Sequence, residues 1–474
     1  MASNEEFNQA FARRHLHRVK VLSLCLPQKA WPAFAETLAS SEWGWLEKLD
    51  IDLKERHPAP FRTLRPVNAP SLYYLKMRNC SIPFTTPNLT HLDFTLDGGE
   101  EESLPTPDEL IMMLNQCRGL ETLRLWKTVP DMTQRRDKRL YATLPYLSKL
   151  TLCSSPQRIE ALAAQMIFPN WTHITLDLNY IKDAFPSPET DPKDADKITL
   201  EQGISTVETI RKRVELYGYD AGFVPDATGM ILHPSRDNRF AFFDDDSPDD
   251  AFLDVTMHKT GRAETESLVD FCRTLHARFN LSGITRAAIG SRYESEEDWK
   301  EIYLLFPNIV DLKVDEFGNH SSIPAIETLE PVSPPDTMEL DGDSSLKSEQ
   351  KGLVPLPFLA VLRFQSVYYR LEDDNKHFNR LEKILKARAT IGASLHKLDI
   401  GRFNKDSVSK YRRAKEEKIV AFRQELLDRL GKIVPEVVGD PRLDLPKWAL
   451  LDDDLVEDEE DENDEEESIA DSYY

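Results

Sequence analysis

The chain has 474 residues, of which 40% are hydrophobic and 30% charged, and its formal net charge at pH 7 is −23. This apolar content supplies a large core and excludes a wholly disordered chain, while the length indicates about three domains or a repeat protein. Residues 452–467 hold 13 acidic residues and no basic one. We therefore expect an acidic body with a strongly acidic tail, which is unsuited to wrapping nucleic acid.

The cysteines indicate a reducing compartment, and the N-terminus indicates an intracellular protein. Five cysteines are scattered at spacings that suggest no disulfide framework. No stretch approaches the roughly 18 uncharged apolar residues of a membrane-spanning helix. The first residues, MASNEEFNQAFARR, lack the apolar core of a signal peptide. We expect a cytoplasmic or nuclear protein with no membrane partner.

One short apolar pattern recurs along the chain, in which the second and third apolar residues follow the first by three and five positions. It is typical of the strand segment of leucine-rich repeats, where alternate side chains point into the core. The first run is Val19-Leu22-Leu24, Leu46-Leu49-Ile51, Leu72-Leu75-Met77, Leu89-Leu92-Phe94, Leu120-Leu123-Leu125, Leu147-Leu150-Leu152 and Trp171-Ile174-Leu176. A looser second run is Ile284-Ala287-Ile289, Ile309-Leu312-Val314, Leu359-Leu362-Phe364 and Leu395-Leu398-Ile400. In two units Cys80 and Asn179 complete a fuller signature and are expected to cap the following turn by bonding to backbone.

Helix signals lie between these strands. Thr106-Pro107-Asp108-Glu109 is a capping box with proline at the first helical position, and Ser155-Pro156 and Ser295 are further helix starts. The expected inward residues are Leu110, Met113, Leu114 and Cys117 in the first helix, Ile159, Leu162 and Met166 in the second, and Trp299, Ile302 and Leu305 in the third. The order of strand, loop and helix predicts an α/β fold, an irregular leucine-rich-repeat-like solenoid with parallel strands on its concave face and helices and loops outside.

The composition divides the chain into five parts. They are a first repeat-like run at 1–180, an irregular insertion at 181–261 with a helix at 198–216 and short strands, a second run at 262–405 with a flexible loop at 331–352, a C-terminal capping helix at 406–450, and a disordered acidic tail at 451–474. The short strands are expected at Phe240–Phe243 and Phe252–Met257, and the capping helix at about 406–433, with Ile419, Phe422, Leu426 and Leu430 toward the core.

Proline-led phrases precede successive strands. They are Pro87-Asn88-Leu89, Pro145-Tyr146-Leu147, Pro169-Asn170-Trp171, Pro307-Asn308-Ile309 and Pro357-Phe358-Leu359. In these phrases, from about residue 17 to residue 405, the chain resembles the F-box/leucine-rich-repeat-like proteins of mushroom-forming (basidiomycete) fungi. The resemblance implies that the repeats recruit a protein substrate, while an F-box docks the chain onto the Skp adaptor and cullin of an SCF-type ubiquitin ligase.

The sequence departs from this family because it contains no F-box. The segment Leu104–Leu110 imitates the opening of that motif but continues directly into a repeat unit, so we interpret it as a repeat helix. We expect either a chain that continues upstream or a relative without an F-box.

Catalytic motifs are absent from the sequence. It contains no Gly-rich phosphate loop, no Gly-x-Ser-x-Gly, no His-Glu-x-x-His and no Cys-x-x-Cys. We therefore expect no enzyme activity, no cofactor and no metal.

A partner-binding surface is the better hypothesis, because residues between the inward-facing positions point to the concave face. Tyrosine, arginine and tryptophan are frequent interface hot spots. The candidate residues are Tyr74, Lys76, Arg78, His91, Asp93, Arg124 and Trp126. The alternative is that Tyr74 and Trp126 pack against a neighbouring loop.

The predicted function is a protein–protein interaction module that resembles the substrate-recognition repeats of an F-box adaptor. Two alternatives stay open, a repeat scaffold with no ubiquitin link and a nuclear protein whose acidic tail binds basic proteins. The sequence names no partner.

Overall fold

The structure is a computed structural model that describes residues 18–41, 43–54, 66–97, 104–132, 141–178, 200–215, 227–234, 237–243, 251–258, 268–279, 281–290, 295–317, 323–331, 354–367, 374–403 and 416–439. Within these residues, fifteen strands form one mixed but mostly parallel sheet. In spatial order the strands are β1 (Val21–Leu26), β2 (Lys48–Leu53), β4 (Tyr74–Arg78), β6 (His91–Thr95), β7 (Thr122–Trp126), β9 (Lys149–Ser154), β11 (His173–Leu178), β14 (Leu253–His258), β13 (Asp237–Phe243), β12 (Gly229–Pro234), β15 (Arg286–Ile289), β16 (Asp311–Phe317), β17 (Val361–Val367), β18 (Lys397–Phe403) and β19 (Glu436–Val438).

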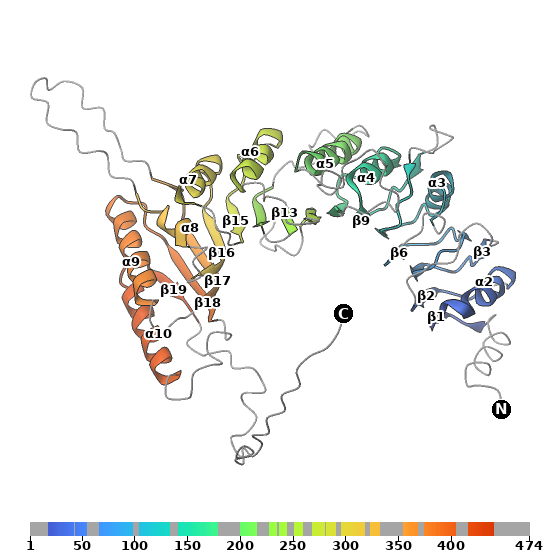
Figure 1. Ribbon diagram of the computed structural model, residues 1–474, viewed down its shortest axis with the longest axis horizontal. Coiled ribbons are helices and arrows are strands. Elements are labelled where there is room, and N and C mark those ends of the chain that lie inside the picture. Colours follow the sequence, from blue (N-terminus) through green and yellow to red (C-terminus); the bar gives the residue numbers. More distant parts are fainter. Residues whose placement is uncertain are drawn as a thin grey trace, which may run out of the picture.

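Helices lie on one side of this sheet. They are the 3₁₀ helix η2 (Gln28–Ala30) and the α-helices α2 (Trp31–Ser40), α3 (Pro107–Gln116), α4 (Pro156–Ala163), α5 (Leu200–Glu215), α6 (Leu268–Arg278), α7 (Glu296–Leu305), α8 (Ile323–Glu327), α9 (Asp374–Thr390) and α10 (Glu416–Leu430). The sheet curves into an arc with the helices along its outer side (Figure 1). We call the side of the sheet that faces away from the helices the inner face. Two small parallel sheets are formed by β3 (Val67–Asn68) with β5 (Phe84–Thr85) and by β8 (Ala142–Thr143) with β10 (Met166–Ile167), and each of these short strands precedes a strand of the main sheet.

The second and third residues of all eleven apolar triads lie on strands of the main sheet, and these inward residues are in register. Leu49 pairs with Leu75, and Leu75 pairs with Leu92. In the second run Leu312 pairs with Leu362. Because equivalent positions point the same way on parallel strands, the leucines form one continuous core between sheet and helices.

Nine turns of one geometry precede strands of the described chain. In each, the backbone N–H of the fourth residue donates to the carbonyl of the first at 3.0–3.4 Å, and the fourth residue is buried. The fourth residues are Leu46, Leu72, Leu89, Leu120, Leu147, Thr172, Ile284, Ile309 and Leu359. The proline-led phrases lie in these turns, because the fixed φ of proline suits a turn.

The prediction that Trp171 points inward is wrong, because its side chain is 56% exposed. In the unit of β9, two residues separate the buried turn residue Leu147 from the first inward strand residue, Leu150. In the unit of β11, only one residue separates the buried turn residue from Ile174. Thr172 is therefore the buried residue, and its Oγ1 donates to the carbonyls of Leu147 and Pro169, both at 2.8 Å. Trp171 occupies the exposed third position of the turn.

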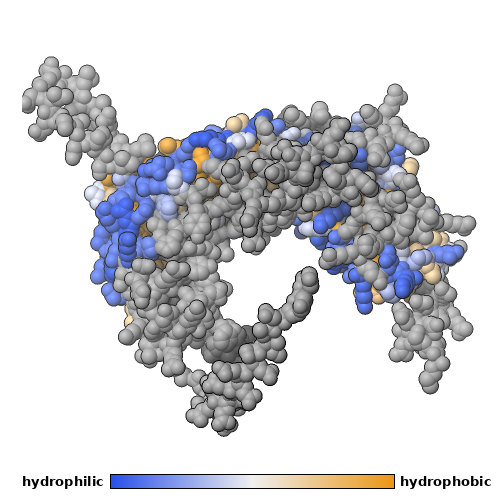
Figure 2. Space-filling model, in the orientation of Figure 1, coloured by the Kyte–Doolittle hydropathy of each residue, from blue (hydrophilic) through white to orange (hydrophobic). Residues whose placement is uncertain are grey.

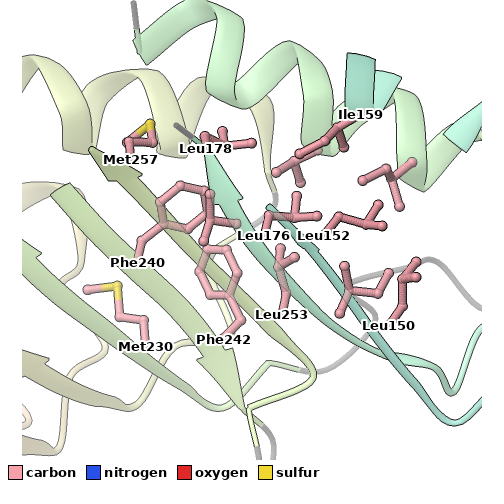
Figure 3. Close-up of a cluster of buried hydrophobic side chains, with 14 of the residues drawn as sticks. Leu150, Leu152, Ile159, Leu176, Leu178, Met230, Phe240, Phe242, Leu253 and Met257 are labelled. Atoms are coloured by element: carbon pink, nitrogen blue, oxygen red, sulfur yellow. The ribbon is translucent and has the colours of Figure 1, made fainter. Parts of the chain in front are cut away.

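The predicted strands of 181–261 join the main sheet between β11 and β15, where β13 runs antiparallel to its two neighbours. The core continues through this change of direction, since Phe240 and Phe242 lie beside Leu176 and Leu253 (Figure 3). Phe243 is also buried, and its ring covers Gly229 so closely that a Cβ there would lie 2.1 Å from a ring carbon. A side chain at residue 229 would therefore require the Phe243 ring to move.

Helix starts agree with the sequence. Thr106 and Ser295 form capping boxes with Glu109 and Asp298, and Ser155 precedes α4 without a side-chain cap bond. Met166 was expected on that helix, but α4 ends at Ala163 and Met166 belongs to β10.

The C-terminal helix α10 covers the later part of the predicted 406–433 helix, and the predicted residues before it lie outside the described part of the chain. Leu426 and Leu430 are buried, as expected, and the side chains of Ile419 and Phe422 are not among those described. The acidic tail also lies outside the described residues.

Candidate functional site

The seven candidate residues lie together on the inner face of three adjacent strands, β4, β6 and β7. We call this set, Tyr74, Lys76, Arg78, His91, Asp93, Arg124 and Trp126, the inner strip. Their positions alternate with buried core residues, as the strand period requires. The register places Lys76, Asp93 and Arg124 side by side in one row across the strands. The inner hollow of the arc is open in the space-filling view, and the described residues visible there are mainly hydrophilic (Figure 2).

Opposite charges alternate along this row. Asp50 of β2 lies 3.7 Å from Lys76 Nζ, and Asp93 Oδ2 lies 3.5 Å from Arg124 Nη1. Asp93 is only 5% exposed, and its Oδ1 also accepts from Thr95 Oγ1 at 3.0 Å. The four charges of this row therefore sum to zero. Each basic side chain lies beside an acidic side chain of a neighbouring strand.

Aromatic rings complete the inner strip. The rings of Tyr74 and His91 stack with centroids 4.5 Å apart and planes 10° from parallel. The Arg124 guanidinium lies 5.0 Å from the centroid of the Trp126 ring, within cation–π range. Tyr74 and Trp126 thus pair with members of the strip itself, and both stay partly exposed.

Burial affects two groups of the strip. Desolvation lowers the pKa of His91, and the nearby Asp93 carboxylate opposes this shift only partly. The ring is therefore neutral at physiological pH. Arg124 Nε is buried and has no hydrogen-bond partner among the described residues.

Arg78 belongs to a network that the sequence did not predict. Its Nε donates to Asp97 Oδ2 at 2.8 Å, which raises the pKa of the guanidinium. Asp97 is held in turn by Asn79, whose Oδ1 accepts from the Asp97 backbone N–H at 2.8 Å. Asn79 Nδ2 donates to the Leu53 carbonyl at 3.1 Å and to Asp97 Oδ2 at 3.2 Å.

Asn79 rather than Cys80 makes the principal side-chain bonds of this turn. Cys80 Sγ lies 3.9 Å from the Ile51 carbonyl, a weak contact by comparison. Asn79 has a φ of 56°, and asparagine tolerates this left-handed conformation better than most residues. Asn179, the other predicted cap, lies outside the described residues.

Two searches limited to the described residues have negative results. No group of three or more His, Cys, Asp or Glu side chains is placed to hold a metal ion in this part of the chain. No helix in the same part is long and apolar enough to cross a membrane.

Comparison with known proteins gives little similarity. No protein-family model matches the chain, and no curated protein matches it. Among solved structures, the crystal structure of a TLR13–ssRNA13 complex aligns at 13% identity and a TM-score of 0.29, over 83% of this chain. The chain spans about half of that protein, 54% of its length. A similarity of this strength assigns neither a family nor a ligand.

Proposed function

We propose that the chain is a leucine-rich-repeat-like solenoid that acts as a non-enzymatic protein-interaction scaffold, with the inner strip as its contact surface. The observation that carries this proposal is the cluster of Tyr74, Arg78, Arg124 and Trp126 on three adjacent strands of a curved sheet. These residue types bury large areas and still donate hydrogen bonds, which makes them frequent hot spots.

The contacts within the inner strip favour binding. The ion pairs and ring contacts already restrict the side chains of Lys76, Arg78 and Arg124. A partner that binds them orders few additional rotamers, and each ordered side chain would otherwise cost about 0.5–1.5 kcal/mol. Because each basic side chain of the strip is paired with a nearby carboxylate, the expected partner surface is polar and aromatic rather than strongly charged.

The experiment compares partners recovered with a tagged chain and with an Arg124→Ala, Trp126→Ala double variant. The matched control is Arg363→Ala, because Arg363 also lies on the inner face and pairs across strands with Asp311, at 3.0 Å, but on β17. We expect one or more proteins to be recovered with the wild type and the control but not with the double variant. Equal recovery with all three chains would contradict the proposal.

Substrate recognition for an SCF-type ubiquitin ligase is the finer form of this proposal. It is supported by the proline-led phrases of the resembled family, which occupy equivalent turns before β6, β9, β11, β16 and β17. Copurification of a Skp adaptor and a cullin with the tagged chain would support it, whether an upstream F-box or another contact mediates the binding. Recovery of partners without either protein would leave a scaffold with no ubiquitin link.

The acidic tail gives the remaining alternative, a nuclear protein that binds basic partners. Deletion of residues 452–467 separates it from the proposed function. Under the inner-strip proposal the recovered partners stay bound, whereas a tail-binding protein loses them.

A further inference from the structure

The nine equivalent turns carry different residue types at their third position. At three positions it is polar and bonds to the preceding turn. Ser71 Oγ donates to the Gly44 carbonyl at 2.6 Å, Asn88 Nδ2 to the Pro70 carbonyl at 2.8 Å, and Asn308 Nδ2 to the Ser282 carbonyl at 2.9 Å. Glycine occupies the position at 119 and 283. The fold therefore accepts small or polar residues here and does not require a ring.

Aromatic side chains nevertheless occupy the third position in four turns. The exposed fractions are 63% for Trp45, 65% for Tyr146, 56% for Trp171 and 62% for Phe358. Tyr146 and Trp171 precede β9 and β11, which pair directly, so these two rings lie on neighbouring turns. Lys149 and His173, the first residues of the two strands, are cross-strand partners and are also exposed.

We call Tyr146, Lys149, Trp171 and His173 the rim patch. It combines two exposed aromatic rings, of the residue types that are frequent in interface hot spots, with a lysine and a histidine. The surrounding segment is basic within an acidic protein. Residues 118–178 contain nine Lys or Arg and five Asp or Glu, a net charge of +4 in a chain of −23.

We propose that the rim patch binds residues 452–458 of the same chain. This segment reads DDDLVED, in which Leu455 and Val456 follow three aspartates. Its apolar side chains suit the rings of Tyr146 and Trp171, and its carboxylates suit Lys149 and His173. The segment therefore complements the patch both in hydrophobicity and in charge.

The length of the connection permits this contact. The described chain ends at Gly439, directly after β19, and β11 lies eight strands away in the sheet. At about 4.8 Å per strand, β19 and β11 are about 38 Å apart across the sheet. The turn before β11 also lies about five residues away along the strand direction, which lengthens the path from Gly439 to about 42 Å. Asp452 is 13 residues beyond Gly439 and reaches about 44 Å when extended, and Val456 reaches about 58 Å.

Bound in this way, the acidic segment would lie beside β7, the strand that carries Arg124 and Trp126. A partner that extends from the inner strip over β9 and β11 would have to displace it. The proposal does not depend on the inner strip, because it rests on different residues and a different contact.

Zero-length carbodiimide crosslinking of the full chain tests the contact, since it joins an amine to a carboxylate only when the two touch. In the wild type we expect Lys149 to be linked to the tryptic peptide that begins at Trp448. A Tyr146→Asn, Trp171→Asn double variant is expected to lower the yield roughly tenfold, as for the loss of hot-spot rings. Asparagine occurs at the equivalent positions 88 and 308, so this variant is expected to fold with an unchanged thermal midpoint.

Two controls keep the result interpretable. Phe358→Asn removes an equally exposed ring from a turn outside the rim patch and is expected to leave the link unchanged. The ion pair of Lys397 with Glu436 is present in the structure and serves as a positive control for the reaction.

Three results would overturn the proposal. One is the control link between Lys397 and Glu436 without any link at Lys149. Another is linkage of the tail peptide to Lys410, Lys415 or Lys418 in place of Lys149. The third is linkage only between copies, seen as mixed pairs when isotopically light and heavy chains are combined.

Discussion

Replacing Asn79 by alanine is expected to destabilise the protein by about 4 kcal/mol. The side chain is 3% exposed and makes three hydrogen bonds, to the Leu53 carbonyl at 3.1 Å, to Asp97 Oδ2 at 3.2 Å and from the Asp97 N–H at 2.8 Å. At about 1 kcal/mol for each bond, their loss accounts for about 3 kcal/mol. The remainder comes from the φ of 56°, which costs alanine about 1 kcal/mol.

Urea denaturation of the wild type, Asn79→Ala and Asn79→Gly separates the two contributions. Glycine loses the same three bonds but adopts positive φ without strain, so it is expected to be more stable than alanine by about 1 kcal/mol. A loss below about 1 kcal/mol for Asn79→Ala would refute the assigned bonds. A glycine variant no more stable than the alanine variant would refute the strain.

The remaining predictions concern buried groups elsewhere. Arg388 is 1% exposed and donates to the carbonyls of Pro355 at 2.8 Å and Leu356 at 2.9 Å. Arg388→Met leaves these buried acceptors unpaired and is expected to lower the free energy of unfolding, measured by urea denaturation, by about 3 kcal/mol. A variant as stable as the wild type would contradict this. Gly229→Ala is expected to cost about 1–3 kcal/mol by overpacking, measured in the same way, and a neutral effect would show that the ring above it can move. Alkylation at pH 8, detected by mass spectrometry, is expected to modify the exposed Cys25. Burial raises the pKa of Cys117 to about 12, so this thiol is expected to stay unmodified. Rapid labelling of Cys117 would contradict its burial.

The sequence predicted the strands well because their signal is local. Alternate residues of a strand point to opposite faces, so the three- and five-residue spacings identify both the strand and its inward side. The same rule identified the exposed row that contains the inner strip. Helix caps were predicted for a similar reason, since Thr106 and Ser295 bond within their own first turn.

What the sequence could not predict depends on contacts between distant residues. The bonds of Asn79 join three separate strand ends, and the repeat spacing selects Cys80 instead. Trp171 fits the apolar pattern, but one residue fewer before the strand moves it to the exposed turn position. Strand order is also non-local, because β12, β13 and β14 join the main sheet through pairings that leave no periodic signal.

The inner strip is tested most directly by the affinity of Arg124→Ala, Trp126→Ala for a partner recovered with the wild-type chain, measured by isothermal titration calorimetry. Loss of two central hot-spot residues is expected to weaken binding by at least about 2 kcal/mol, or roughly thirtyfold, while Arg363→Ala binds as the wild type does. Unchanged affinity of the double variant would contradict the assignment of the inner strip as the binding surface.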